Sequence, residues 1–174
     1  MTMPYVLDAN VMNLFQKERL EQISGHAHRT IELVTQDCCI ALDDGGHCQQ
    51  EWLACAGGAH PIALADWIVD MMVDGNIRMF SFCKSSMYKE LTGKGIPKKD
   101  HKWIRLALGS GSELIVTDDI DLFDPTRKNC CSEEKNAIKR NGTGPISKFL
   151  KKTYGVSICC PEKIDDYFER IDES

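Results

Sequence analysis

Four segments of the sequence each carry a carboxylate where an apolar pattern stops, and these carboxylates are the residues best suited to chemistry. They are Asp8, Glu51, Asp100 and Asp119. Carboxylates that share a cleft repel one another unless a cation neutralises them. Hard oxygen ligands favour Mg²⁺ or Mn²⁺, which keep several waters and take phosphate oxygens as further ligands. The set therefore predicts a metal-dependent site for a phosphodiester substrate.

Each of these residues also has a purely structural explanation. Asp8 can cap a helix, Asp100 can favour a helix N-terminus through the dipole, and Glu51 can be a solvated helix charge. Aspartates also suit turns, which offers a second explanation for the run Asp118-Asp119-Ile120-Asp121. That run follows the apolar segment Leu114–Thr117 directly, and this position favours a functional role. Either Asp118 or Asp119 can be the metal ligand.

Short apolar segments alternate with helical ones, and this order predicts a three-layer α/β/α fold with a central parallel sheet. The expected strands are Tyr5–Leu7, Cys38–Leu42, Ile77–Phe82, Leu114–Thr117 and Val156–Cys159. The expected helices follow Asp8 and cover Ser24–Val34, the segment from Glu51 to Gly57-Gly58, Pro61–Met72, Lys98–Leu108 and Ile146–Tyr154. Ligands of such sheets collect at the carboxyl ends of the strands. Asp8 and Asp119 are therefore expected at one edge of the sheet.

The chain has 174 residues, of which 43% are hydrophobic and 27% charged, and we expect a single domain over residues 1–174. The longest apolar run, Ile62–Val73, is interrupted by Asp66 and Asp70. It falls short of the roughly 20 apolar residues that a membrane span needs. The N-terminal residues lack the pattern of a secretory signal. We therefore expect a cytoplasmic protein without membrane contact.

The nine cysteines are expected to be reduced thiols. Their number is odd, and the adjacent pairs Cys38-Cys39, Cys130-Cys131 and Cys159-Cys160 cannot each close a normal bridge. A structural zinc site needs two pairs of ligands at suitable spacing, which His47-Cys48 and Cys55 do not supply. Most of the cysteines are expected to pack in the interior.

The net charge of -5 is distributed unevenly. Between Thr126 and Lys152, eight basic residues against two glutamates give a balance of +6, which leaves -11 for the remainder. Residues 125–145 are polar and contain glycine, so we expect a loop or a partly helical insertion there. Its basic side chains, Lys135, Lys139 and Arg140, are candidates for contact with a phosphate backbone. The alternative is an ordinary solvated loop.

Taken in order, these segments resemble the PIN-domain nucleases, and in particular the small toxin-type endoribonucleases of that family. The similarity rests on Val6–Asn10, Glu51, Asp100 with Ile104 and Ala107, Ile115–Asp121, Tyr154–Val156 and Cys160–Ile164. Each motif is short, but their order and spacing cover nearly the whole chain. The chain departs from the compact family pattern in a basic insertion between Asp124 and Pro145, which leaves its branch of the family open.

The resemblance implies a three-layer domain with a metal-dependent endonuclease site that usually acts on RNA. It assigns Asp8, Glu51, Asp100 and Asp119 to the four acidic positions, Asp121 to an auxiliary metal position, and Asn10 and Thr117 to small polar positions that face the substrate. In the expected mechanism, Asp8 and Asp119 hold the principal Mg²⁺ or Mn²⁺ ion. Asp100 completes its shell or shares a second ion, and Glu51 orients or deprotonates the attacking water.

Other functions stay open at this point. A phosphatase of the haloacid-dehalogenase type also has an aspartate after its first strand, but it needs a second one two residues later, where this chain has Asn10. A structure-specific DNA nuclease, or a non-catalytic module that binds RNA or protein, would carry the same acids. The resemblance also implies an inhibitory antitoxin or a larger complex as partner, and a homodimer is a further implication of the family.

Overall fold

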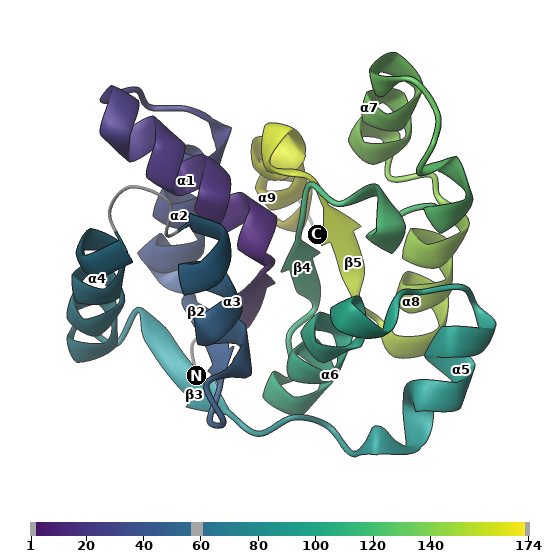
Figure 1. Cartoon of the computed structure of the whole chain (residues 1–174), viewed down its shortest axis with the longest axis horizontal. Coiled ribbons are helices and arrows are strands. Elements are labelled where there is room, and N and C mark those ends of the chain that lie inside the picture. The colour runs from purple at the N-terminus through teal and green to yellow at the C-terminus, as the bar shows by residue number, and fades with distance from the viewer. Residues whose placement is uncertain (1–2, 57–60, 173–174) are drawn as a thin grey trace.

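The computed structural model describes residues 3–56 and 61–172, and its centre is a five-stranded sheet (Figure 1). The strands are β1 (Pro4–Leu7), β2 (Cys39–Asp43), β3 (Ile77–Phe80), β4 (Leu114–Val116) and β5 (Ser157–Cys159). Their order is β3-β2-β1-β4-β5, and every neighbouring pair is parallel. Helices flank the sheet, so the expected three-layer α/β/α fold is confirmed.

Helices connect the strands in the order that the sequence predicts. They are α1 (Ala9–Glu21), α2 (His26–Asp37), α3 (His47–Ala56), α4 (Pro61–Val73), α5 (Tyr88–Gly93), α6 (His101–Ser110), α7 (Ser132–Asn141), α8 (Pro145–Tyr154) and α9 (Ile164–Asp172). Gly57 and Gly58, which we expected to end α3, lie outside the described residues. None of the helices in the described ranges is long and apolar enough to cross a membrane.

Helices α2, α5 and α9 differ from the sequence-based expectation, and α5 lies in a polar segment for which no helix was predicted. Helix α2 begins two residues later than expected, because the Glu18 carboxylate of α1 accepts hydrogen bonds from the backbone N–H groups of Ala27 and His28, at 3.2 and 2.7 Å. These bonds satisfy first-turn donors that have no partner within the helix. Helix α9 was not predicted at all. It packs on β1, where Phe168 meets Tyr5 edge to face at 5.7 Å between ring centroids.

The segment that we expected to be a loop or a partly helical insertion contains α7. This helix has no fully buried residue, and polar contacts fix both of its ends. Glu134 in its first turn pairs with Arg127 at 2.8 Å, and Lys139 in its last turn pairs with Asp118 at 2.7 Å. The partly helical alternative is therefore the one observed, and α7 is attached to the loop that follows β4.

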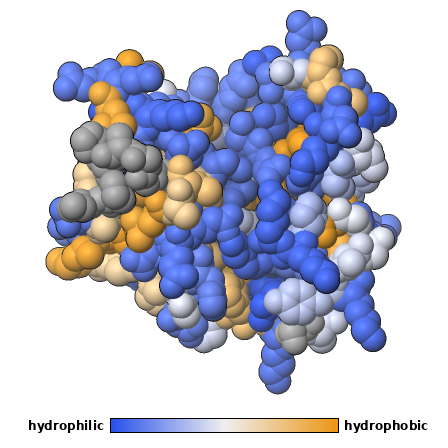
Figure 2. Space-filling view, in the orientation of Figure 1, coloured by the Kyte–Doolittle hydropathy of each residue, from blue (hydrophilic) through white to orange (hydrophobic). Residues whose placement is uncertain are grey.

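One face of the molecule has an apolar side and a hydrophilic middle. Exposed apolar side chains gather on the side of α4 and β3, where Val69, Val73 and Met79 are exposed. Figure 2 shows this apolar area on the left and a largely hydrophilic surface through the middle of the same face. The carboxyl ends of β1 and β4 thus open onto polar surface rather than onto the apolar side.

A single side chain ties α3 to the end of β1. Trp52 is fully buried, and its Nε1–H donates to the backbone carbonyl of Leu7 at 3.0 Å. Leu7 is the last residue of β1 and precedes Asp8, whereas Glu51 precedes Trp52 on α3. The hydrogen bond therefore fixes the position of Glu51 on α3 relative to Asp8 at the end of β1.

We predict that Trp52→Phe lowers the free energy of unfolding by about 1–3 kcal/mol, because the substitution removes this donor and leaves space around a smaller ring. Urea unfolding followed by circular dichroism measures the change. Trp67→Phe on α4, where the ring is only half-buried, is the matched control and should cost less. Equal unfolding midpoints for the two variants would contradict this role of Trp52.

Candidate metal centre

Residues that follow the two adjacent strands β1 and β4 form the candidate site. The chain leaves β1 for β2 on one side and returns to β4 on the other, so the strand order reverses between β1 and β4. At such a switch point the loops diverge and leave a crevice outside the carboxyl ends of the strands. The backbone N–H of Asp8 donates to the carbonyl of Val116 at 2.9 Å, which keeps the two strand ends level.

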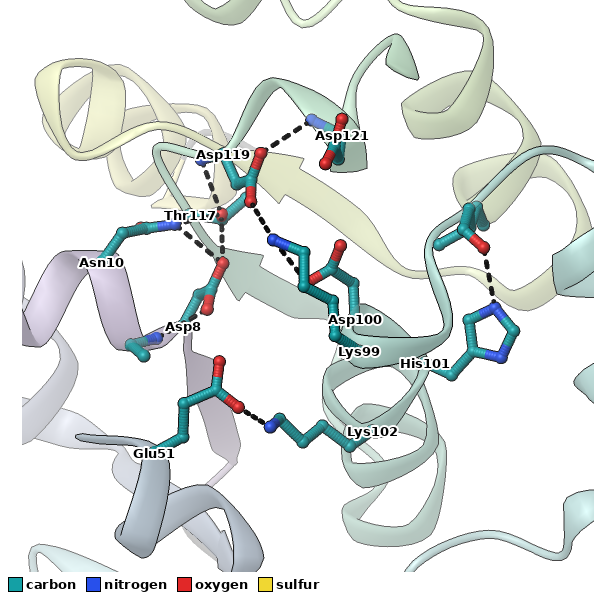
Figure 3. Close-up of polar contacts among 12 residues, drawn as sticks. Asp8, Asn10, Glu51, Lys99, Asp100, His101, Lys102, Thr117, Asp119 and Asp121 are labelled. Carbon is teal, nitrogen blue, oxygen red and sulfur yellow. Dashed lines mark hydrogen bonds and ion pairs between the residues drawn. The ribbon is translucent and has the colours of Figure 1, made fainter. Parts of the chain in front are cut away.

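A hydrogen-bond network joins the ends of these strands. Asp8 Oδ2 accepts from Thr117 Oγ1 at 2.7 Å and from Asn10 Nδ2 at 2.9 Å. Asn10 Oδ1 in turn accepts from the backbone N–H of Asp118 at 2.8 Å, and Thr117 Oγ1 accepts from that of Asp119 at 3.0 Å. Asn10 and Thr117 therefore position the loop after β4 relative to β1 (Figure 3).

Three carboxylates form the closest acidic group, which we call the three-aspartate group. Asp100, Asp119 and Asp121 each offer an oxygen within 4.8 Å of the other two. Asp100 lies in the turn before α6, and the other two lie in the turn after β4 (Figure 3). The backbone N–H of Asp121 donates to Asp119 Oδ1 at 3.0 Å and fixes the orientation of that carboxylate.

Two oxygens of this group have no hydrogen-bond partner within the described residues. They are Asp100 Oδ2 and Asp121 Oδ1, on residues that are 2% and 1% exposed. A buried carboxylate oxygen without a donor is costly, because it has lost its hydration without compensation. A hard divalent cation would satisfy both oxygens at once, and carboxylates are its preferred ligands. The residues present therefore fit Mg²⁺ or Mn²⁺.

The pKa values of two carboxyl groups in the site also favour a bound cation. Burial raises the pKa of Asp100 to about 7, and repulsion from Asp119 adds to this while Lys99 opposes it. Burial also raises the pKa of Asp8, although the hydrogen bond from Thr117 lowers it. Both carboxyl groups resist ionisation mainly because burial removes water from their charged forms, and repulsion from Asp119 adds to this. This is the condition under which carboxylates bind a cation.

Lysines neutralise part of this charge. Lys99 Nζ lies 3.3 Å from Asp119 Oδ2 and 3.8 Å from Asp100 Oδ1, and Lys128 Nζ lies 2.8 Å from Asp121 Oδ2. Both lysine side chains are exposed, at 58% and 60%, so they can leave the carboxylates and remain solvated. A cation held by the three-aspartate group would therefore release Lys99 and Lys128 for contact with a phosphate.

Glu51 and Asp8 lie beside the three-aspartate group and are not members of it in the described part of the chain. Glu51 projects from α3 and forms an ion pair with Lys102 of α6. Figure 3 shows the carboxylates of Asp8, Glu51 and Asp100 around a common region at the strand ends. The structure thus groups two of the four expected acids with the auxiliary Asp121 and keeps the other two alongside.

The basic residues expected to contact phosphate occupy different positions. Lys139 pairs with Asp118, which places Asp118 outside the three-aspartate group and assigns Asp119 to it. Arg140 pairs with Glu162 at 2.7 Å. Lys135 has no side-chain ion pair within the described ranges. Of the three, Lys139 is the one that is linked directly to the loop of the candidate site.

The pairing of Glu51 with Lys102 and of Asp121 with Lys128 was not predicted from the sequence. The first pair joins α3 to α6, so nothing local in the sequence indicates it. The second joins residues that are only seven positions apart, and the basic pair Arg127-Lys128 directly after the acidic run that follows β4 is the signal that could have indicated it.

A scan of the chain against protein-family models finds no matching family, and a search of curated proteins finds no match. The fold and the site therefore define the molecule by themselves, as an α/β protein with an acidic group at the switch point of a parallel sheet. The resemblance to PIN-domain nucleases rests on the residues of this chain alone.

We predict that Asp100→Asn stabilises the metal-free protein at pH 8, where the carboxyl group is ionised, because the change removes a buried charge that its neighbours repel. In the presence of EDTA the gain should be about 1–2 kcal/mol, or roughly 2–8 °C in melting temperature. The same variant should lose most of the rise in melting temperature that Mn²⁺ gives the wild type. Thermal denaturation with and without Mn²⁺ measures both effects.

Asp70→Asn on the exposed side of α4 is the control for this experiment and should behave as the wild type does. An Asp100→Asn variant with an undiminished response to Mn²⁺ would show that the three-aspartate group is not the cation site.

Proposed function

We propose that the protein is a Mg²⁺- or Mn²⁺-dependent nuclease that hydrolyses phosphodiester bonds, with single-stranded or structured RNA as its substrate. The observation that carries this proposal is the three-aspartate group between the end of β4 and the start of α6, with two buried oxygens that lack a donor in the described chain. The resemblance to the PIN-domain nucleases supports the same chemistry from the order of the acidic motifs.

In this proposal Asp100, Asp119 and Asp121 hold the cation, and Asp8 adds negative charge beside them. The bound cation supplies charge neutralisation at the phosphate and activation of water. Glu51 approaches from α3 and accepts the proton of the attacking water. Its ion pair with Lys102 of α6 holds the carboxylate in place for this role.

The basic side chains bind the substrate's phosphates. Lys99 and Lys128 become available when the cation takes their carboxylate partners, and their exposed side chains reach outward from the site. Lys135, Lys139 and Arg140 extend the basic surface along α7. Asn10 and Thr117 take a positioning role in this account, because their polar atoms already bind Asp8 and the loop after β4.

One observation favours a second candidate function, that of a non-catalytic module that binds RNA. Glu51, Asp119 and Asp121 each already have a lysine partner, so the site is partly neutralised by the chain itself. The two buried oxygens without a donor weigh against this candidate, because lysine pairing leaves them unsatisfied. For either function we propose the cytoplasm, since none of the nine cysteines, all of which lie in the described residues, forms a disulfide.

We predict that the purified protein cleaves single-stranded RNA when Mn²⁺ is added and stops when EDTA is added. Glu51→Gln should bind Mn²⁺ nearly as the wild type does but lose about 10²–10⁴-fold in turnover, because only the proton acceptor is removed. Asp119→Asn should lose both metal binding and turnover. Cleavage of labelled RNA and DNA, together with calorimetric titration of Mn²⁺, separates these effects.

Asp66→Asn, an exposed change on α4, is the control and should retain full activity. The same residual activity in wild type, Glu51→Gln and Asp119→Asn would identify a contaminating nuclease. A wild type that binds RNA but cleaves neither RNA nor DNA would favour the non-catalytic module.

A further inference from the structure

A pocket with a volume of about 560 Å³ lies apart from the three-aspartate group, between the end of α7, one side of α8, β5 and α9. In Figure 1, α7 and α8 stand at the right of the molecule, and β5 and α9 lie nearer its centre. The volume falls within the range of about 300–1,000 Å³ that is typical of ligand sites. Of the residues that line it, the function proposed above uses only Lys139 and Arg140.

Half of the residues that line the pocket are cationic and none is acidic. Seven of the fourteen lining residues are lysine or arginine: Lys139, Arg140, Lys148, Lys151, Lys152, Lys163 and Arg170. Acids outside the lining pair with three of them, through Asp118, Glu162 and Asp166. A wall of this composition attracts an anion with several negative charges.

Three of these lysines belong to one stretch of α8. Lys148, Lys151 and Lys152 are exposed, and within the described part of the chain none of them forms an ion pair with a carboxylate. The opposite side of α8 is anchored in the core by Ile146 and Leu150. The helix therefore presents three positive charges beside the pocket that no carboxylate of the described chain neutralises.

The floor of the pocket is apolar. Ile158 and Cys159 of β5 are buried beneath it, and Tyr167 of α9 contributes a half-buried ring. Burial raises the pKa of Cys159 to about 12, so its thiol is neutral and acts as apolar surface. A ligand that combines a flat apolar part with phosphate charges matches such a floor and rim, and a nucleotide has this combination.

Lys139 connects the pocket with the candidate metal centre. Its side chain lines the pocket, while its Nζ contacts the carboxylate of Asp118 at 2.7 Å and the backbone carbonyl of the same residue at 3.4 Å. Asp118 directly precedes Asp119 of the three-aspartate group. A polyanion in the pocket thus lies next to the loop that carries the proposed cation ligands. A nucleic-acid strand carries phosphates at regular intervals and can reach from the pocket to this loop. A free nucleotide is too short to do so.

We propose that the pocket between α7, α8, β5 and α9 binds one nucleotide of a nucleic-acid strand and guides the strand toward the three-aspartate group. The base lies on Ile158, Cys159 and Tyr167, and the phosphates contact the lysines of α8. The pocket would thus set the path of the substrate strand in the nuclease proposed above. The identity of the ligand as a nucleic acid rests on that proposed function. Binding itself needs neither cation nor cleavage.

The test is a binding experiment in EDTA, where no cleavage takes place. The probe is a fluorescein-labelled single-stranded RNA of twelve nucleotides and mixed sequence, and anisotropy is measured at several salt concentrations. The pocket variant is Lys148→Gln/Lys151→Gln/Lys152→Gln. The matched control is Lys17→Gln/Lys84→Gln/Lys89→Gln, which removes the same charge from exposed lysines outside the pocket lining.

We expect the pocket variant to bind the RNA at least tenfold more weakly than the wild type at 0.1 M salt. The slope of log affinity against log salt concentration should become shallower by about 2, from three lost contacts on a single strand. The control should change affinity less than twofold, and both variants should keep the wild-type melting temperature. Uridine 5'-monophosphate and inorganic phosphate at equal concentration should displace the strand poorly.

Equal losses in the two variants would overturn the proposal, because the effect would then follow net charge and not position. Binding of uridine 5'-monophosphate as tight as that of the strand would overturn it as well, and would assign the pocket to a free nucleotide. These outcomes are independent of the nuclease proposal, which fails only if Mn²⁺-dependent cleavage fails.

Discussion

Repulsion among carboxylates at the ends of β1 and β4 is the constraint on which the rest of the structure depends. The parallel sheet brings its carboxyl ends to one edge, so any acids that follow neighbouring strands must meet there. Two kinds of contact reduce this repulsion. Neutral donors, Asn10 and Thr117, hold Asp8 on the buried side, and lysines on exposed side chains pair with Asp119 and Asp121 on the open side.

This division gives the site a fixed part and an adjustable part. The fixed part is the strand ends with their hydrogen bonds, to which Trp52 adds a bond between α3 and β1. The adjustable part is the set of lysine contacts, which are made by flexible and largely exposed side chains that solvent screens. A cation can therefore enter the three-aspartate group without disturbing the sheet. The lysines that it displaces remain close by as contacts for a phosphate.

Much of the fold follows from local patterns, whereas the details of the site do not. The central strands β1, β2 and β4 were predictable because they are buried on both faces and read as continuous apolar runs. Asp8 and Asp119 were placed at one sheet edge because each follows the carboxyl end of a parallel strand. The sequence could not distinguish Asp118 from Asp119, because that choice depends on the contact of Asp118 with Lys139 on α7. It also did not indicate that Glu51 meets Lys102, since the pair joins two separate helices.

The central claim is that Asp100, Asp119 and Asp121 together hold a divalent cation. The most direct measurement is an anomalous difference map from crystals of the protein soaked in MnCl₂. The account predicts one strong manganese peak within coordination distance of all three carboxylates, about 2.0–2.3 Å from their oxygens. A map with no peak there, or with manganese bound only to acids elsewhere on the surface, would contradict it.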